Sequence, residues 1–371
     1  MTSNMIHKKH TVAGLMSGTS LDGLDIAVCT FEYKNDRWVY TTVASTTIDY
    51  SAGFKQELNQ AMRLPGEELI LLDRSFGAFQ GEEVKAFLHA QGLQVDLVAA
   101  HGHTIFHNPA KGYTLQIGSG ASLYAACGIP VVCDFRSVDV AYGGQGAPLV
   151  PLGDELLFSA YSGCLNLGGI ANIGYMHSGM NVAFDICAVN IVLNALSLKE
   201  GKVYDDGGRI AESGSLIPAL LEKLEALPFY SETGPKSLGR EWVDAVIFPL
   251  LENYSSHSNK DMMHTFVVHC GQQIAKALQG LPVKNNTRNL LITGGGAFNT
   301  FLVEQIRLHA GSQIEIVVPD TTTIQYKEAI IFAFLGLLRM YDIPNAKSTV
   351  TGASVNTIGG AVYGSLNDFF S

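Results

Sequence analysis

The sequence predicts an α/β protein built from two similar halves, and three observations support this. A pattern of strand, glycine-rich turn and strand occurs at residues 12–28 and again at 163–176, and each copy opens a stretch of mixed strands and helices. The length of 371 residues corresponds to about two domains. Apolar residues make up 47% of the chain and charged residues 16%, which is typical of a globular protein with large cores. Two halves with facing glycine loops predict a ligand cleft between domains.

The first third of the sequence begins as a set of neighbouring strands. Apolar runs bounded by turn residues predict the strands, and the polar residues 34–37 predict a hairpin turn. A helix with apolar residues on one side, Ile70 and Leu71 among them, is expected at 67–91. The expected strands are 11–16, 24–33, 38–48, 97–100, 113–117 and 129–133, and a second helix is expected at 120–127.

A second series of elements starts at Gly163. The expected strands are 163–167, 171–176, 182–184, 289–293 and 314–318, and the expected helices are 190–198, 300–309 and 329–340. No long linker separates the halves, so we expect the hinge at element ends near residues 135–150. The predicted domains are residues 1–135 together with about 350–371, and residues 136–349.

Composition narrows the range of partners. The net charge of −10 argues against a broad surface for nucleic acid or anionic membranes. No apolar run reaches the roughly 20 residues that a membrane-spanning helix needs. The six cysteines form no Cys-x-x-Cys pair and lie mostly in apolar surroundings, which favours a reducing, cytoplasmic setting.

The turn at residues 17–23, Ser-Gly-Thr-Ser-Leu-Asp-Gly, is the most informative segment. Its small residues let backbone approach a ligand, and its N–H groups, with the hydroxyls of Ser17, Thr19 and Ser20, are suited to phosphate oxygens. The carboxylates of Asp22 and Asp25 are suited to a hydrated Mg²⁺. The alternative is an ordinary hairpin with a glycine-rich turn.

Two further carboxylates each allow two interpretations. Asp185 follows the apolar run 182–184 and precedes a helix, where it either points into a ligand site or caps the helix. Glu328 comes just before the apolar run 329–340, where a charge either favours the helix dipole or serves a site. The residues alone leave both choices open.

Three other segments carry candidate ligand contacts. His101, His103 and His107 resemble a metal-binding set, but no Cys, Asp or Glu lies nearby in sequence, so hydrogen bonding to a ligand by His101 or His103 is preferred. Arg136, ahead of the glycine loop 143–148, is suited to clamping a carboxylate or to a surface ion pair. The loop 294–296 lies between a strand and a helix, where backbone approaches nucleotides, although it is neither a Walker A loop nor Gly-x-Gly-x-x-Gly.

Together these segments resemble the anhydro-N-acetylmuramic acid kinase family of the hexokinase/actin-like superfamily. The resemblance extends from about Gly14 to Gly360. The matching motifs are 16–25, 100–104, 115–118, 132–136, 143–151, 165–172, 235–241, 294–296 and 350–354. The resemblance implies a two-domain hexokinase/actin-like (RNase H-like) fold with a ligand cleft between the domains, and a homodimer.

The resemblance also implies a reaction. The family opens the anhydro bridge of 1,6-anhydro-N-acetylmuramic acid with water and phosphorylates O6 from ATP with Mg²⁺, giving N-acetylmuramic acid 6-phosphate in cell-wall recycling. Asp185 is implied as the general base and Glu328 as an acid facing the sugar. The residues expected to bind the nucleotide are Gly18, Thr19, Ser20, Leu21, Asp22, Gly23, Leu24, Asp25, Gly168, Gly169, Gly294, Gly295 and Gly296. Those expected to bind the sugar are His101, Arg136, Gln145 and Asn190.

The chain departs from the family pattern in the proposed site. Where the family usually has Asp-Thr-Gly-Pro-Gly-Asn, residues 185–190 read Asp-Ile-Cys-Ala-Val-Asn, and 321–327 replace a more acidic stretch. We expect residues 186–189 to keep a helix start whose N–H groups face the ligand. Two other functions remain as alternatives, which are a kinase for a different anhydro-sugar and a non-catalytic sugar-binding regulator.

Overall fold

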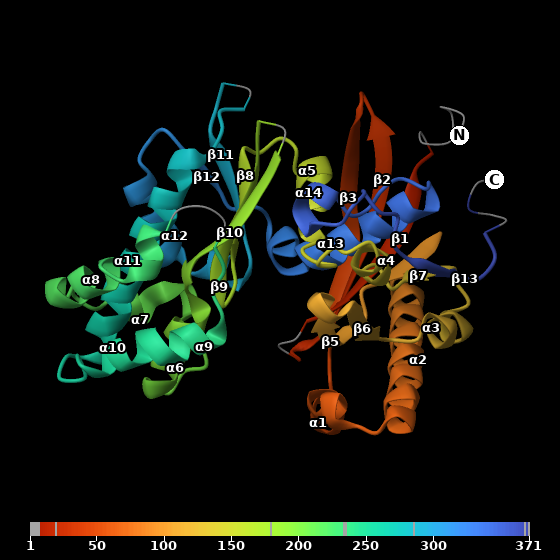
Figure 1. The fold of residues 1–371 in the computed structure, drawn as a ribbon, viewed down its shortest axis with the longest axis horizontal. Helices are drawn as coiled ribbons and strands as arrows, with labels where there is room; N and C mark the ends of the chain where they lie inside the picture. Colours follow the sequence, from red (N-terminus) through yellow and green to blue (C-terminus); the bar gives the residue numbers. More distant parts are fainter. Residues whose placement is uncertain are drawn as a thin grey trace. The chain divides into compact units, whose positions relative to one another are not determined.

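The computed structural model describes residues 8–18, 21–178, 180–232, 236–284, 286–366 and 369. Its contacts divide the chain into two compact units, residues 1–157 with 326–371, and residues 158–325. Each unit has its own main sheet and its own helices (Figure 1). In the part of the chain that the structure describes, no helix is both long enough and apolar enough to cross a membrane.

The first unit is built on a six-stranded sheet in the order β13-β7-β4-β1-β2-β3. β1 pairs antiparallel with β2, and β2 with β3, whereas β1, β4 and β7 run parallel. Asn35 and Asp36 have φ of 51° and 58°, as a two-residue hairpin turn requires, which confirms the turn predicted at 34–37. The strands are β1 (His10–Ser17), β2 (Gly23–Lys34), β3 (Arg37–Asp49), β4 (Leu97–Ala100), β7 (Val131–Cys133) and β13 (Ala361–Tyr363), with β5 (His103–Asn108) and β6 (Tyr113–Ile117) in a separate hairpin.

The second unit repeats this topology. Its sheet has the order β10-β9-β8-β11-β12, again with two antiparallel pairs on one side of the first strand and two parallel pairs on the other. The strands are β8 (Gly163–Leu167), β9 (Ile170–His177), β10 (Met180–Ala188), β11 (Asn289–Thr293) and β12 (Glu315–Val317). The predicted hexokinase/actin-like fold class is therefore confirmed, since both halves share one arrangement of five strands, to which the first unit adds β13 antiparallel to β7.

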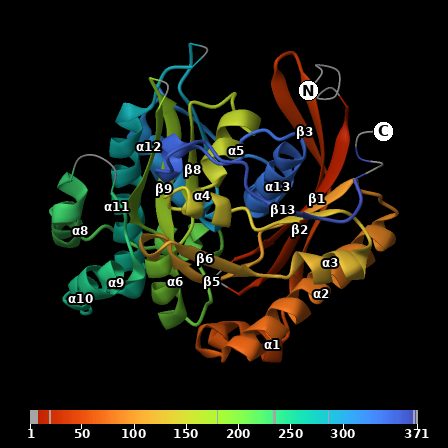
Figure 2. The ribbon, with the colours of Figure 1, turned by 45° about the vertical axis from the view of Figure 1, so that its right-hand side comes forward.

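Helices cover both faces of the first sheet. α2 buries Phe76 against Ala13 and Leu15 of β1. The other face packs on α13, so closely that a Cβ on Gly14 would overlap the carbonyl oxygen of Ala329. Figure 2 shows α2 with α3 beside it in this unit. The helices of the unit are α1 (Ala52–Gln60), α2 (Gly66–Gln91), α3 (Gly120–Cys127), α4 (Ser137–Ala141), α5 (Val150–Leu157), α13 (Thr321–Met340), which begins in the second unit, and α14 (Ser348–Thr351).

The second unit has one large core. Buried residues of α11, such as Phe266 and Cys270, pack with Leu165 and Leu167 of β8 and with the end of β10. The helices are α6 (Asn190–Lys199), α7 (Arg209–Glu212), α8 (Pro218–Glu225), α9 (Arg240–Trp242), α10 (Phe248–Glu252), α11 (Asn259–Ala277) and α12 (Thr300–Ala310).

The structure divides the chain at other places than the sequence suggested. The divisions fall after Leu157 and Gln325, rather than near residues 135–150 and 350. Residues 326–340 belong to the first unit because α13 packs on its sheet, where a Cβ on Gly336 would lie 2.5 Å from that of Ala99. α13 also starts at Thr321, eight residues before the expected 329, since Asp320 accepts a hydrogen bond from the N–H of Thr323.

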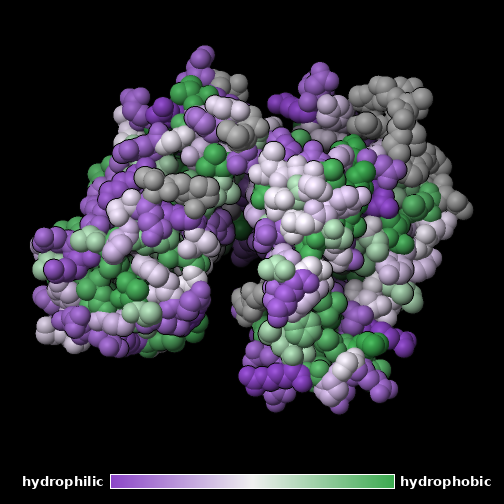
Figure 3. Space-filling model, viewed as in Figure 1, coloured by the Kyte–Doolittle hydropathy of each residue, from purple (hydrophilic) through white to green (hydrophobic). Residues whose placement is uncertain are grey.

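One detail of the predicted core is wrong. Ile70 and Leu71 were expected on the buried side of the helix at 67–91, but they are 62% and 59% exposed. The neighbouring Met62 is exposed as well, and Figure 3 shows apolar surface on this unit. The buried face of α2 carries Phe76, Val84 and Leu88 instead. Buried positions of α2 recur at every fourth residue, 72, 76, 80, 84 and 88, and residues 70 and 71 lie outside this row.

Candidate functional site

The predicted phosphate loop connects β1 to β2 in the first unit. The N–H of Leu21 donates to the carbonyl of Gly18 over 3.3 Å, and Leu21 has a left-handed φ of 59°. Thr19 and Ser20 lie outside the described residues. The hydroxyl of Ser17 is buried and engaged by Tyr50 at 2.7 Å and by His103 Nδ1 at 3.1 Å, so the expectation that it faces a phosphate is wrong. With the Ser17 hydroxyl engaged, the phosphate site is supported by the backbone N–H groups of the turn.

The two carboxylates of this loop differ in environment. Asp22 is exposed, whereas Asp25 is half-buried and its Oδ1 accepts a hydrogen bond from Thr47 Oγ1 over 2.6 Å. Burial raises the pKa of Asp25, repulsion from Asp22 raises it further, and the bond from Thr47 opposes both. A divalent cation beside Asp25 would favour its charged form and so offset this rise in pKa.

These two carboxylates suit a Mg²⁺ ion that arrives with a nucleotide. Mg²⁺ keeps several waters and takes one or two protein carboxylates together with phosphate oxygens. Among the described residues no group of three or more His, Cys, Asp or Glu side chains is placed to hold a metal by itself. Asp22 and Asp25 thus fit a nucleotide-borne ion rather than a permanent all-protein site.

Glu328 lies inside α13, not at its start, so the helix-dipole interpretation is wrong. Its side chain reaches solvent, yet the surrounding protein removes enough hydration to raise the pKa of the carboxyl. The positive charges of Lys327 and Arg136 oppose this rise, and Asp25 and Asp154 add to it. Lys327 also pairs with Asp154 at 2.8 Å, so its charge is shared. Glu328 is therefore electrostatically coupled to the phosphate loop and to Arg136.

Arg136 is held by two neutral acceptors. Its Nε and Nη2 lie 3.0 and 2.8 Å from Nε2 of His101, and its Nη1 donates to the carbonyl of Gly146 over 2.6 Å. Burial and the Arg136 charge lower the pKa of His101 to about 3, so the imidazole is neutral. Nδ1–H donates to the carbonyl of Gly102 over 2.9 Å, which leaves Nε2 as the acceptor. His101 was expected to bind substrate, but both of its ring nitrogens are hydrogen-bonded to protein groups.

The other two histidines of that motif have separate partners. His103 contacts Ser17, and His107 Nδ1 lies 3.0 Å from Thr114 Oγ1. Gln145 is exposed on the glycine loop, and its N–H donates to the carbonyl of Thr351 over 2.7 Å. The structure therefore places Gln145 with an exposed side chain next to Gly146, which holds Arg136.

Asp185 lies within β10 of the second unit. A β-bulge falls between Asp185 and Cys187, the strand continues to Ala188, and α6 begins at Asn190 with Val189 in the cap position. The helix-cap interpretation of Asp185 is therefore wrong. A bulge re-aims a side chain out of the regular alternation of a strand.

Residues 236–238 fix the orientation of Asp185. The N–H of Asp185 donates to the carbonyl of Lys236 over 2.9 Å. Oδ2 accepts from the N–H of Leu238 at 2.8 Å and from Ser237 Oγ at 3.1 Å. Within the described residues Oδ1 accepts no hydrogen bond from protein. One oxygen is held and the other is available, which is the arrangement a general base needs.

Sequence reasoning missed this supporting segment. Its motif, 235–241, stood out in the sequence, but nothing local connected it with a strand some fifty residues earlier. Lys236 is itself fixed, since Nζ donates to the carbonyl of Phe229 over 2.8 Å and lies 4.3 Å from the centre of that ring. The only available signal was a run of polar and glycine residues without helical period.

The glycine loops of the second unit surround the start of α6. The N–H groups of Val189 and Ile191 donate to the carbonyl of Gly169, and that of Asn190 donates to Gly168. The expectation that these N–H groups face a ligand is therefore wrong. Asn190 Nδ2 donates to the carbonyl of Leu167 over 3.1 Å, which ties α6 to the end of β8.

The loop after β11 closes against the same residues. Gly294 has φ of 82°, and a Cβ on Gly296 would lie 2.7 Å from the Cβ of Leu167 and 3.5 Å from Asn190 Oδ1. Only glycine fits such a turn at this distance. The structure thus gathers Gly168, Gly169, Asn190 and Gly294–Gly296 at one end of the second sheet.

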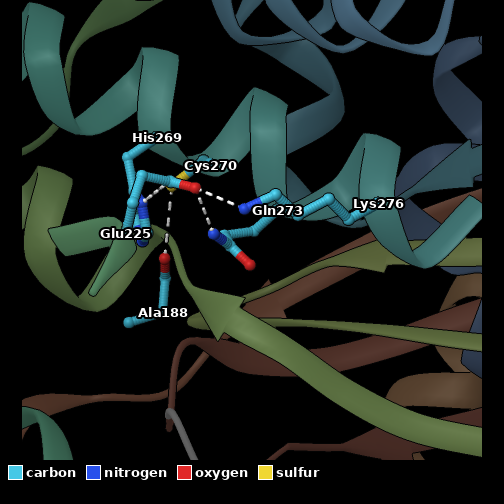
Figure 4. Close-up of polar contacts among 6 residues, drawn as sticks. All are labelled: Ala188, Glu225, His269, Cys270, Gln273 and Lys276. Carbon is cyan, nitrogen blue, oxygen red and sulfur yellow. Dashed lines mark hydrogen bonds and ion pairs between the residues drawn. The ribbon is translucent and has the colours of Figure 1, made fainter. Parts of the chain in front are cut away.

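The segment that departs from the family pattern is part of the core. Ile186, Cys187, Ala188 and Val189 are all buried and belong to the apolar cluster of the second unit. Cys270 of α11 lies 3.4 Å from the carbonyl of Ala188, and α11 is joined to α8 through Glu225, which contacts His269, Gln273 and Lys276 (Figure 4). Residues 186–189 therefore end a strand and are not an open loop.

The expected site residues divide between the two units. Gly18, Leu21–Asp25, His101, Arg136, Gln145 and Glu328 belong to the first unit. Asp185, Gly168, Gly169, Asn190 and Gly294–Gly296 belong to the second. Leu24 is a fully buried residue of the first core and is paired with Ser17 of β1 and Ile48 of β3, so neither its side chain nor its backbone is exposed to a ligand.

Comparisons with known proteins match nearly the whole chain to one family. A model of the family described as anhydro-N-acetylmuramic acid kinase matches residues 10–365. The anhydro-N-acetylmuramic acid kinase of Mannheimia succiniciproducens is 32% identical over 375 residues, covering 96% of this chain and 99% of that protein. The one of Pseudomonas fluorescens is 34% identical over 366 residues, covering 94% and 98%.

Solved structures are more distant. Component A of (R)-2-hydroxyglutaryl-CoA dehydratase from Acidaminococcus fermentans is 12% identical with a TM-score of 0.45, and 88% of this chain and 97% of that chain are covered. The ROK hexokinase of Thermus thermophilus is 12% identical with a TM-score of 0.38, covering 88% and 99%. The fold assignment made above rests on the strand order of this chain.

Proposed function

Because this chain belongs to the anhydro-N-acetylmuramic acid kinase family, we propose that it opens the 1,6-anhydro bridge of 1,6-anhydro-N-acetylmuramic acid with water and transfers the γ-phosphoryl group of ATP to O6. The product is N-acetylmuramic acid 6-phosphate, and the reaction is a step in recycling cell-wall sugar. The chain is an anhydro-sugar kinase, and its match to the family extends over nearly all of its length.

The proposal for the chemical step depends on Asp185. Its carboxylate has one oxygen bonded to Leu238 and Ser237 and the other unbonded by described residues, which supports a role as general base. Asp185 takes a proton from water, whose oxygen attacks C1. The bond between C1 and the bridging oxygen breaks, and that oxygen, now O6, attacks the γ-phosphorus while ADP leaves. Water supplies the oxygen at C1, and the bridging oxygen remains as O6.

The nucleotide is assigned to the glycine-rich turns. The backbone of the turn at Gly18, Leu21 and Asp22 would meet phosphate oxygens, and the loops at 168–169 and 294–296 would approach the nucleotide. Asp22 and Asp25 would hold Mg²⁺, which when bound neutralises phosphate charge during transfer. The support for this part is the raised pKa of Asp25 beside Asp22, which a cation would reverse.

The sugar is assigned to Arg136, Gln145 and Glu328. Within the described part of the chain, Arg136 uses three of its five N–H groups on His101 and Gly146, which leaves two for a ligand oxygen. The raised pKa of Glu328 suits a carboxyl that donates or accepts a proton at a sugar hydroxyl. His101 would act through Arg136, and Asn190 through the end of β8.

ADP release with a panel of anhydro-sugars tests the function. The panel contains 1,6-anhydro-N-acetylmuramic acid and two analogues, 1,6-anhydro-N-acetylglucosamine and 1,6-anhydroglucose, which lack the lactyl group. We expect turnover to be highest with the muramic sugar. Faster turnover of an analogue would mean a kinase for a different anhydro-sugar. Binding without ADP release would mean a non-catalytic sugar-binding protein.

Two wider assignments accompany the proposal. A reducing, cytoplasmic location is supported by the six cysteines, none of which forms a disulfide or is exposed. A homodimer is supported by the family resemblance, and light scattering of the purified protein measures it. Nucleic acid and membranes are not proposed as partners, given the net charge of −10.

A further inference from the structure

A buried carboxylate that the proposed reaction does not use lies in α4 of the first unit. Asp139 is 0% exposed. Its Oδ1 accepts from Thr351 Oγ1 at 2.7 Å and from Thr357 Oγ1 at 3.5 Å, and its Oδ2 accepts from the N–H of Gly146 at 2.8 Å. None of the ion pairs found among the described residues includes Asp139. A buried carboxyl is costly unless its polar atoms are hydrogen-bonded, and here three protein donors hold its two oxygens.

Asp139 organises the glycine loop that follows it. Its main-chain carbonyl accepts from the N–H of Gly144 over 2.9 Å, and a Cβ on Gly144 would overlap the Asp139 carboxylate. The next residue, Gln145, donates its N–H to the carbonyl of Thr351. Residues 144–146 therefore wrap around the carboxylate, and Thr351 bonds both to the loop and to the carboxylate.

Gly146 of this loop connects Asp139 to Arg136. Gly146 donates its N–H to Asp139 and, on its other side, accepts from Arg136 Nη1 at 2.6 Å. Among the described residues, the other hydrogen-bond acceptor of the guanidinium is His101, which is neutral and fixed by Gly102. The direction of the two free N–H groups of Arg136 consequently depends on where Asp139 places the Gly146 carbonyl.

We propose that Asp139, with the hydroxyl of Thr351, is the positioning residue that aims Arg136 at the sugar through Gly146. This inference rests on the proposed function, in which Arg136 contacts the sugar. It also gives a role to the motif 350–354, which stood out in the sequence without an assigned purpose. Asp139 touches neither substrate in this scheme and acts only through Arg136.

Steady-state kinetics on the full chain test the proposal. Asp139→Asn removes one of the two acceptor oxygens, and we expect KM for the anhydro-sugar to rise about tenfold or more, with KM for ATP within about twofold of wild type. Thr351→Val, which loses only the hydroxyl, should raise the sugar KM less, and Thr351→Ser should restore it. Thr357→Val is the matched control, since its bond of 3.5 Å is long.

A double-mutant cycle separates positioning from general support of the fold. If Asp139 acts through Arg136, Asp139→Asn should have no further effect on the sugar KM in an Arg136→Ala background. Additive effects, or equal changes of both KM values, would overturn the proposal. If Asp139→Asn fails to fold, the comparison of Thr351→Val with Thr351→Ser decides by itself, because equal sugar KM values for the two would overturn it.

The proposed function has its own readout in the same experiment. Wild-type turnover of the anhydro-sugar tests the kinase, whereas only the variants test Asp139. If the wild type binds the sugar without turnover, the kinase fails, and calorimetric Kd values for the same variants replace KM in every comparison. A wild type that neither turns over nor binds 1,6-anhydro-N-acetylmuramic acid would overturn both.

Discussion

The backbone N–H of Leu238 donates to Oδ2 of Asp185 over 2.8 Å, and this contact joins two segments that are far apart in the sequence. A backbone donor cannot rotate away, so it fixes the plane of the carboxylate more firmly than a side chain would. The bulge lies directly after Asp185, and Ser237 adds a second bond to the same oxygen. Oδ1, which accepts no bond from the described residues, is the atom that the proposed base uses.

Asp185→Asn should lower kcat about 10²–10⁴-fold, because the amide cannot take a proton from water. Nucleotide affinity should stay within about twofold, as measured by calorimetry with a non-hydrolysable ATP analogue. Ser237→Ala is the matched control, since it removes one hydrogen bond and keeps the base, and a loss of up to about tenfold in kcat/KM is expected. Near-normal turnover of the asparagine variant would reject Asp185 as the base.

The second prediction concerns pH and the phosphate loop. The pKa of Asp25 is raised by burial and by Asp22, and lowered by the bond from Thr47. Its charged form is therefore lost at a higher pH than for an ordinary aspartate, and KM for MgATP should rise as pH falls through that range. Thr47→Val removes the bond that favours the charged form, so the rise should begin at a still higher pH.

Initial-rate measurements across pH 4–8 check this expectation at saturating sugar, with the range chosen to bracket ordinary carboxyl values. Thr46→Val is the control on the same strand, since Thr46 has no part in the bond to Asp25. Asp22→Asn should lower the Asp25 pKa and move the KM rise to lower pH, while weakening Mg²⁺ binding. If the pH profiles of Thr47→Val and Asp22→Asn both match that of the wild type, Asp22 and Asp25 do not belong to the nucleotide site.

The third prediction is a pH dependence of stability in the second unit. Contacts with His269, Lys276 and Gln273 outweigh burial and lower the pKa of Glu225 from 4.5 to about 2 (Figure 4). The charged form is thus favoured in the folded state, and its stabilisation is fully present above about pH 4.5 and lost as pH falls towards 2. Burial lowers the pKa of His269, so that residue is neutral and donates its Nδ1–H to Glu225. The shift of the Glu225 pKa corresponds to a contribution of at most about 3 kcal/mol to the free energy of unfolding, because solvent screens this partly exposed group.

Urea unfolding at pH 7 and at about pH 3 tests this effect. Glu225→Gln should lower the free energy of unfolding at pH 7 and have a smaller effect at the lower pH, where the wild-type carboxylate is partly protonated. Glu222→Gln, an exposed residue on the same helix, is the matched control and should change little at either pH. An equal loss for Glu225→Gln at both values would show that its charge does not contribute.

Local patterns predicted most elements of the fold, and long-range contacts explain the errors. Strand and helix periods identified the paired sheets, because each half contains the same series of apolar runs. The end of β10 was missed because residues 186–188 are themselves apolar and continue the strand. The start of α13 was missed because the three threonines 321–323 have low helix propensity, although Asp320 caps the helix there. The partners of Asp185 and Arg136 could not be predicted, since residues 236–238 and Gly146 reach them only through the tertiary fold.

The last prediction concerns residues 186–189, where the family usually has Thr-Gly-Pro-Gly. In this chain Ile186, Cys187 and Val189 are 3%, 0% and 0% exposed and fill the core of the second unit. Replacing the segment by Thr-Gly-Pro-Gly would empty that space and place proline at Ala188, a strand position paired with Ile170. Each lost apolar side chain costs about 1–3 kcal/mol, so the total of about 5 kcal/mol is comparable with the whole stability of many domains.

Urea unfolding and turnover of the exchanged variant measure this cost. We expect a marked fall in the free energy of unfolding and no gain in kcat, because the N–H groups of α6 are already bonded to the carbonyls of Gly168 and Gly169 and have none to offer a ligand. Ile186→Val is the matched control within the segment, with an expected loss of about 1 kcal/mol. A stable variant with higher turnover would contradict the buried arrangement and would mean that the native segment suppresses catalysis. The present packing instead predicts that these side chains replace the glycine–proline turn as the support for Asp185.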